Sequence, residues 1–307
     1  MNALSTSFFQ IQPDTDGEKL MTAIRDLPIS GVELDYRLPA PVFHQICPAL
    51  RTAGIPVASL HNFCPLPLDF LKTGGSGDLF SLSDIRRDER QEAVKRTLQT
   101  IEHAHDLEAK AVVLHCGRVD MPAETQALYE RFRQENTLSQ DTRLWLEGKI
   151  AARDRLKPAH LDALCFSLEK LLTAADRRHV LLGLETRYHY HELPGPDDFE
   201  PLLQKFDGAP IGYWHDTGHA FINEQLGLIA EGRLLGNLSD RLIGMHLHDA
   251  EGLEDHLPPG SGRIDFAALA SQMAPGVLQV LELRPGTPVD AVRQGLAHLA
   301  TCFKDHK

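Results

Sequence analysis

The chain has 307 residues, of which 42% are hydrophobic and 24% are charged, so it can bury one substantial core. Its 31 basic and 43 acidic residues give a formal net charge of −12, which disfavours a broad basic surface for nucleic acid. We expect one domain over residues 1–307. We also expect a cytoplasmic protein, because no apolar run approaches membrane-spanning length and no secretory leader pattern is present.

Apolar, strand-like runs alternate with helix-like runs along the whole chain, a pattern typical of a parallel sheet with crossover helices. Eight such strands suggest an α/β fold, a closed (β/α)8 TIM barrel. The helix over 83–107 is expected to begin at a cap formed by Ser83 and Asp84. The predicted strands cover residues 4–9, 31–36, 56–62, 111–116, 180–186, 211–216, 242–248 and 277–283. The predicted helices between them include 16–27, 41–53, 83–107, 197–206 and 288–303.

The segment between the fourth and fifth predicted strands is too long for one crossover helix. Residues 122–136 and 142–156 both have helical spacing, and 161–175 supplies the expected crossover. Because loops after barrel strands lie at the C-terminal face, a helical insertion over about 118–156 is expected to overhang the active site or to form a homodimer contact. Its apolar side chains are expected to be buried, either against the barrel or against a second subunit. They are Leu128, Phe132, Leu144, Trp145 and Ile150.

Metal-ligand side chains stand at the ends of six predicted strands. Functional residues of barrels collect at these ends, and a carboxylate there is costly to bury unless it is paired or coordinated. Carboxylates with imidazoles suit Zn, Mn, Co or Fe, so the sequence predicts a divalent metal without selecting one. The six side chains are His61, His115, Glu185, Asp216, His246 and Glu282, and His219 follows Asp216 by one helical turn.

Residues 246–262 carry the densest group of such side chains. On an alternating strand His246 and His248 share one face, so both imidazoles are expected to point into one cavity. Metal-bound imidazoles need partners that fix their tautomers, and Asp249 and Thr217 are the candidates. Other histidines are predicted to be surface or packing residues: His44, His103, His105, His160, His179, His298 and His306.

The chain resembles the xylose-isomerase-like TIM-barrel superfamily, which includes sugar and sugar-phosphate isomerases and epimerases and is related to endonuclease IV. The resemblance spans nearly the whole chain and is carried by four motifs. They are D-T-x-H-A at 216–220, H-L-x-D at 246–249, D-H-x-x-x-G-x-G at 255–262 and the L-E pair that ends at Glu282.

In the epimerase branch this resemblance implies a single metal and a small polyhydroxylated substrate. The implied metal ligands are Glu185, Asp216, His246 and Glu282. The expected substrate contacts are Glu33, His219, His248 and Arg284. In the endonuclease branch the His219 position binds a further zinc, and that pattern implies additional metal ligands at His61, His115, His219, Asp255 and His256.

Two classes of enzyme follow from the resemblance. The first is a metal-dependent sugar or sugar-phosphate isomerase or epimerase that transfers a proton next to a carbonyl group, with Glu185 and Glu282 as catalytic acid and base. A keto-inositol dehydratase-type lyase begins with the same proton abstraction and stays open. A barrel that has lost its activity and only binds is disfavoured by the intact ligand set.

The second class is a zinc phosphodiesterase of the endonuclease IV type. It needs basic side chains around its rim, yet the loops over 65–81 and 189–198 hold Lys72 alone, so nucleic acid is disfavoured as a partner. One phosphate or carboxylate of a small substrate could instead be held by an arginine near the ligands. The candidates are Arg187, Arg263 and Arg284.

Overall fold

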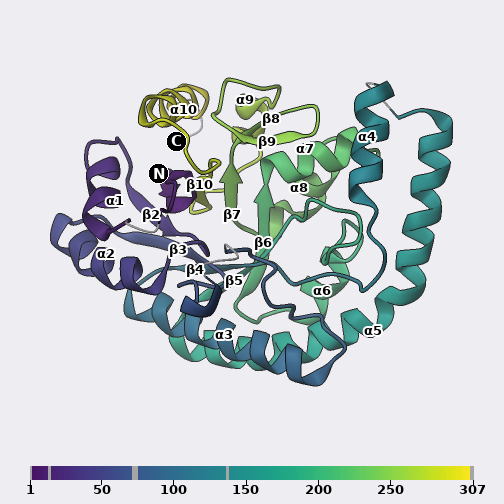
Figure 1. Ribbon diagram of the computed structural model, residues 1–307, viewed down its shortest axis with the longest axis horizontal. Helices are drawn as coiled ribbons and strands as arrows, with labels where there is room; N and C mark the ends of the chain where they lie inside the picture. The colour runs from purple at the N-terminus through teal and green to yellow at the C-terminus, as the bar shows by residue number, and fades with distance from the viewer. Residues whose placement is uncertain (1, 13–14, 71–74, 136–137, 305–307) are drawn as a thin grey trace.

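The computed structural model describes residues 2–12, 15–70, 75–135 and 138–304, and Figure 1 shows its central strands enclosed by helices. Eight parallel strands close into a barrel in the order β1-β10-β7-β6-β5-β4-β3-β2. The predicted (β/α)8 TIM barrel is therefore confirmed. The strands are β1 (Asn2–Ser5), β2 (Gly31–Leu34), β3 (Val57–His61), β4 (Ala111–Leu114), β5 (Leu181–Glu185), β6 (Ile211–Asp216), β7 (Leu242–Leu247) and β10 (Leu278–Leu281).

Helices cover the outside of the barrel, and one hydrophobic core lies between them and the strands. A separate antiparallel hairpin of β8 (Asp249–Glu251) and β9 (Glu254–Leu257) follows β7. In the described part of the chain no helix is long and apolar enough to cross a membrane. The covering helices are α1 (Gly17–Ile24), α2 (Ala40–Ala53), α3 (Arg87–Asp106), the second half of α5 (Gln140–Arg178), α6 (Phe199–Lys205), α8 (Arg233–Leu238), α9 (Phe266–Ala270) and α10 (Val289–Cys302). The remaining helix α7 (Thr217–Gln225) directly follows β6 at the carboxyl end of the barrel.

Outside the insertion, the predicted boundaries differ most from the observed ones at two places, for local reasons. The first strand ends at Ser5, because the Ser5 hydroxyl accepts a hydrogen bond from the Ser7 N–H at 3.4 Å and caps the short helix η1 (Thr6–Phe8). The helix expected from Ser83 begins at Arg87. Ser83 does not cap it, because its side chain is buried and donates to the Arg118 carbonyl at 3.2 Å.

Between β4 and β5 the described residues form two helices, whereas the sequence predicted three. α4 (Thr125–Glu135) lies where the first insertion helix was expected. α5 (Gln140–Arg178) then runs for 39 residues, so the second insertion helix and the crossover helix are one. In Figure 1 the long helix passes along the right side of the molecule, outside α4.

The apolar side of the insertion is buried against the protein's own barrel. Leu128 and Phe132 of α4 pack in one cluster with Ile222 of α7 and with Tyr190, which follows β5. Trp145 and Ile150 pack partly buried on the same cluster, whereas Leu144 is 58% exposed. Because α7 follows β6, the insertion lies at the carboxyl end of the strands, and most of its apolar surface is buried without a second subunit.

We expect Phe132→Ala to destabilise the protein by about 3 kcal/mol, because it opens a cavity between α4 and the barrel. Leu144→Ala is the matched control, since that side chain is 58% exposed and should change the free energy of unfolding by less than about 0.5 kcal/mol. Urea unfolding measures both changes. Equal midpoints for Phe132→Ala and the wild type would mean that α4 unfolds independently of the barrel.

The inside of the barrel is filled by the indole of Trp214, which is fully buried. Gly183 and Gly244 leave room for it, since a Cβ atom at either position would lie 2.9 or 2.1 Å from the indole. The Trp214 ring lies 5.2 Å from the His246 ring, centroid to centroid. The Trp214 indole thus packs beneath the polar side chains at the carboxyl ends of the strands. The same interior cluster contains Ala3, Ala111, Val113 and Val280.

Candidate metal centre

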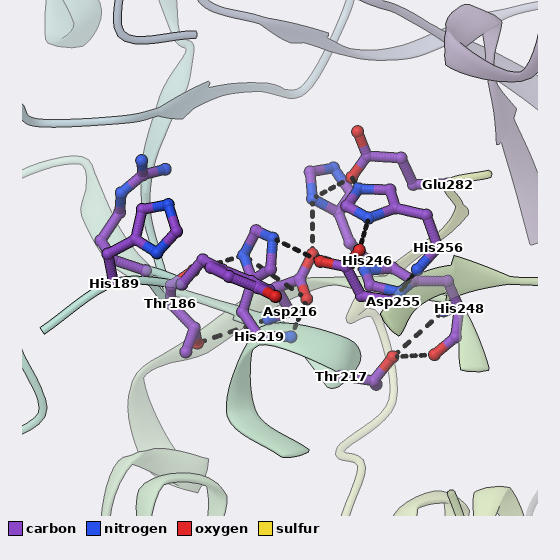
Figure 2. Close-up of polar contacts among 12 residues, drawn as sticks. Thr186, His189, Asp216, Thr217, His219, His246, His248, Asp255, His256 and Glu282 are labelled. Carbon is purple, nitrogen blue, oxygen red and sulfur yellow. Dashed lines mark hydrogen bonds and ion pairs between the residues drawn. The ribbon is translucent and has the colours of Figure 1, made fainter. Parts of the chain in front are cut away.

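Four predicted metal ligands meet at the carboxyl end of the barrel. Glu185 and Asp216 end β5 and β6, His246 lies in β7, and Glu282 follows β10. Each side chain offers one ligand atom, and these four atoms lie within 4.8 Å of one another. Every one of the four residues is at most 3% exposed. Figure 2 shows Asp216, His246 and Glu282 turned toward a common centre.

His246 is the hub of this cluster. Its Nδ1 atom lies 2.7 Å from Glu185 Oε1, 3.0 Å from Glu282 Oε2 and 3.7 Å from Asp216 Oδ2. Burial disfavours a charged ring, but Glu282, Glu33 and Glu185 raise the pKa of His246 well above its ordinary value. The space around Nδ1 therefore favours a cation, which can be a proton on the ring or a metal ion.

The chemistry of these residues fits a divalent cation. Burial of Glu185 raises the pKa of its carboxyl, yet His115, His246 and His61 lower it well below the ordinary value, so the group is ionised. The carboxylates of Glu185, Asp216 and Glu282 are all buried around the ring of His246. A buried group of carboxylates needs positive charge, and carboxylates with imidazole suit Zn, Mn, Co or Fe.

Two further predicted ligands adjoin the centre on the Glu185 side. The Nε2 atoms of His61 and His115 lie 3.2 and 2.8 Å from Glu185 Oε2. The outer nitrogen of His61 faces the Asn62 carbonyl at 3.1 Å, and that of His115 lies 3.4 Å from Asp78 Oδ2. His61, His115 and Glu185 thus form a second group whose ligand atoms lie within 4.8 Å of one another.

The remaining predicted ligands lie on the other side of the centre. His219 faces the Thr186 carbonyl through Nδ1 at 2.9 Å, and its Nε2 atom lies 3.7 Å from Asp255 Oδ2. His256 has a positive φ of 53°, and its Nδ1 atom lies 3.2 Å from Asp255 Oδ1. Figure 2 shows His219, Asp255 and His256 grouped together.

Two residues expected to touch substrate also make contacts within the protein. His248 is fully buried, and both ring nitrogens are engaged, by Asp216 Oδ2 at 3.0 Å and by the His256 N–H at 2.8 Å. It can therefore orient Asp216, and it also forms a group with His219 and His256 that could hold a metal ion. Arg284 is largely exposed and donates to the Asp255 carbonyl, with Glu254 Oε2 3.8 Å away. Arg284 supports the β8-β9 hairpin from outside the site.

The predicted tautomer-fixing partners bind backbone groups instead. The Asp249 carboxylate accepts four backbone N–H groups at 2.8 to 3.0 Å, and this closes the loop that follows β7. The Thr217 hydroxyl donates to the His248 carbonyl at 2.7 Å. Among the described residues, neither side chain forms a hydrogen bond with an imidazole. The four donors to Asp249 are the N–H groups of Ala250, Gly260, Gly262 and Ile264.

Glu33 and the Asp78–Arg187 pair give the site contacts that the sequence did not reveal. Glu33, predicted to bind substrate, is fully buried, and both its carboxylate oxygens lie 3.1 Å from His246 Nε2. Arg187 is buried, with its Nη2 atom 2.8 Å from Asp78 and 3.0 Å from Glu192, whereas its Nε and Nη1 atoms have no hydrogen-bond partner among the described residues. Arg263 is exposed, and Lys72 and His306 lie outside the described residues.

Solved structures with the same fold include several sugar epimerases. The 3-keto-D-glucoside 4-epimerase of E. coli is 20% identical, with a TM-score of 0.67 over 98% of this chain and 99% of that one. A D-tagatose 3-epimerase-like protein is 17% identical, with a TM-score of 0.70 over 99% and 97%. A Thermus thermophilus protein soaked with ZnCl2 is 19% identical, with a TM-score of 0.60 over 100% and 99%.

No curated protein matches the chain significantly. The family described as xylose isomerase-like TIM barrel matches residues 21–302, which contain every candidate ligand named above. The closed parallel barrel and the ligands at its strand ends agree with that match. This chain therefore belongs to the family of xylose isomerase-like TIM barrels.

Proposed function

We propose that this protein is a divalent-metal-dependent isomerase or epimerase that acts on a small sugar or sugar phosphate. The observation that carries the proposal is the approach of Glu185 and Glu282 to His246 Nδ1, at 2.7 and 3.0 Å, from strands on different sides of β7. Two buried carboxylates can then reach one centrally held carbon from different directions. The sugar epimerases among the solved structures with this fold support the same reaction class.

In the proposed reaction Glu185, Asp216, His246 and Glu282 hold the metal, which when bound polarises the substrate carbonyl and so acidifies the neighbouring C–H bond. One of the two glutamates removes that proton from one face of the carbon. The other glutamate returns a proton to the opposite face, so the configuration inverts and no atom is gained or lost. His219 lies beside this group, where it can donate to or accept from a substrate hydroxyl.

Hydrogen exchange with solvent tests the proposal directly. Incubation in deuterated water with a panel of ketoses, ketose phosphates and keto-inositols should place deuterium on the α-carbon of the true substrate, as mass spectrometry would detect. Turnover with full retention of the original hydrogen would indicate a hydride shift and remove the glutamates from these roles. Loss of water from a keto-inositol in the same assay would indicate the lyase instead.

A zinc phosphodiesterase is the second candidate, and a specific observation favours it. The groups around His61 and His115, and around His219 and His256, adjoin the central four residues on either side. Clustered metal ions of this kind can activate water and hold a phosphate. The net charge of −12 argues against a DNA substrate, because phosphate contacts require basic side chains.

We expect no tight binding to duplex DNA that contains an abasic site. The reason is the net charge of −12 together with the burial of Arg187, whose Nη2 atom pairs with Asp78 and Glu192. Fluorescence anisotropy with a labelled duplex at physiological salt measures the affinity, and an undamaged duplex is the control. Metal-dependent cleavage of the abasic strand at low enzyme concentration would place the phosphodiesterase first.

A further inference from the structure

Glu33 reaches His246 across the interior of the barrel. β2 and β7 are not neighbours, since β1 and β10 lie between them. The pairing of β2 with β3 shifts register between Val32 and Glu33, and such an irregularity redirects the side chain that follows it. As a result the Glu33 carboxylate lies behind the His246 ring, on the side away from the three carboxylates of the centre.

The contact is bidentate and completely enclosed. Both oxygens of Glu33 lie 3.1 Å from His246 Nε2, and neither residue is exposed. Ser59, which pairs with Glu33 across β2 and β3, donates its hydroxyl to Glu33 Oε2 at 2.8 Å. The carboxylate is therefore held from two directions and can accept the Nε2–H of His246 in one ring orientation.

His246 differs in this respect from two of the other imidazoles around the centre. The outer nitrogens of His61 and His219 face backbone carbonyls, of Asn62 and Thr186. The outer nitrogen of His246 faces a carboxylate that is fully buried. A hydrogen bond to an ionised acceptor is about twice as strong as one to a neutral acceptor, and in a dry interior it polarises the ring more.

We propose that Glu33 is a positioning residue for the metal: it holds the Nε2–H tautomer of His246 and thereby presents the Nδ1 lone pair to a divalent cation. This inference rests on the proposed function, because it concerns the same metal centre. It assigns to Glu33 control of metal affinity in place of the substrate contact expected from the sequence. Ser59 acts behind it by holding the carboxylate in place.

The experiment measures zinc affinity by competition with a chromophoric chelator, without any turnover. Glu33→Gln keeps the shape of the side chain and removes its charge, and it should weaken zinc binding by about 10- to 100-fold. Ser59→Ala should weaken binding by a smaller factor, about threefold. Glu251→Gln, at an exposed carboxylate of β8, is the matched control and should leave the affinity unchanged. Glu33→Asp keeps the charge and should recover part of the loss.

A second readout separates positioning from a merely structural role. The visible spectrum of the Co²⁺-loaded protein should shift in Glu33→Gln, because the donor strength of His246 falls, and should keep its wild-type form in Glu251→Gln. Equal zinc affinity and an equal Co²⁺ spectrum for Glu33→Gln and the wild type would overturn the inference while leaving the proposed function intact. If Glu33→Gln does not fold, an unchanged affinity and spectrum in both Ser59→Ala and Glu33→Asp would overturn it.

These outcomes also separate this inference from the proposed reaction. A wild-type protein that binds no divalent metal would contradict both. Weaker zinc binding in Glu33→Gln, together with no α-hydrogen exchange on any ketose, would support the role of Glu33 and contradict the proposed reaction.

Discussion

Replacing Glu185 with glutamine is expected to slow hydrogen exchange at the substrate's α-carbon by about a hundredfold to ten-thousandfold. The amide can neither accept the proton nor supply full negative charge to the metal, and Glu185 Oε1 lies 2.7 Å from the ligand atom of His246. Glu282→Gln should have a loss of the same size, because Glu282 Oε2 lies 3.0 Å from that atom. Deuterium incorporation measured by mass spectrometry gives both rates.

The control for these variants is an exposed acidic residue of the β8-β9 hairpin. Glu254 is exposed, so Glu254→Gln should exchange at the wild-type rate. Binding of a substrate analogue should persist in Glu185→Gln and Glu282→Gln, which would assign the loss to proton transfer. Exchange at the wild-type rate in either glutamate variant would remove that residue from the acid and base pair.

Purified protein is expected to contain at least one divalent transition metal per chain, and removing it should abolish exchange and lower thermal stability. The buried carboxylates of Glu185, Asp216 and Glu282 repel one another when no cation lies between them. A metal present at about 100 times its dissociation constant should add roughly 2.7 kcal/mol to the free energy of unfolding. Elemental analysis and thermal unfolding before and after chelation measure both effects.

His246→Ala tests whether the metal binds at this centre, because it removes the imidazole around which the three carboxylates gather. Its metal content should fall by at least one ion per chain. His105→Ala, at a histidine whose ring faces a backbone carbonyl on the surface, should keep the wild-type content. Protein that was never exposed to chelator, yet holds no stoichiometric metal and takes up none on titration, would contradict the central claim.

Strand periodicity predicted the barrel well because each buried parallel strand is a short apolar run between turn residues. The insertion was harder: residues 142–156 and 161–175 were expected as two helices, yet α5 continues through Pro158, a residue type that locally disfavours a helix interior. Contacts on both sides of Pro158 override this local preference. Lys157 Nζ binds Asp198 Oδ1 at 2.7 Å, and His160 Nδ1 faces the Ser83 carbonyl at 2.8 Å. Neither partner lies near this helix in the sequence.

The central ligands could be predicted because each ends a strand, and parallel strands of a barrel bring their ends to one face. The residues that orient those ligands could not be predicted in the same way. Glu33 and His246 are 213 residues apart, and their contact depends on a register shift between β2 and β3. For Asp249 the residue type suggested an imidazole partner, but the loop geometry surrounds it with backbone N–H groups.

The Trp214 indole inside the barrel can serve as an intrinsic fluorescent probe of the metal centre. The chain has two tryptophans, and they lie in different surroundings. Trp145 is in α5, where Arg131 and Lys149 lie 5.2 and 5.3 Å from its ring centroid. Trp214 is fully buried, with its ring 5.2 Å from the ring of His246. Emission from Trp214 therefore responds to a change of charge or a paramagnetic ion at the metal centre, whereas emission from Trp145 responds to the insertion.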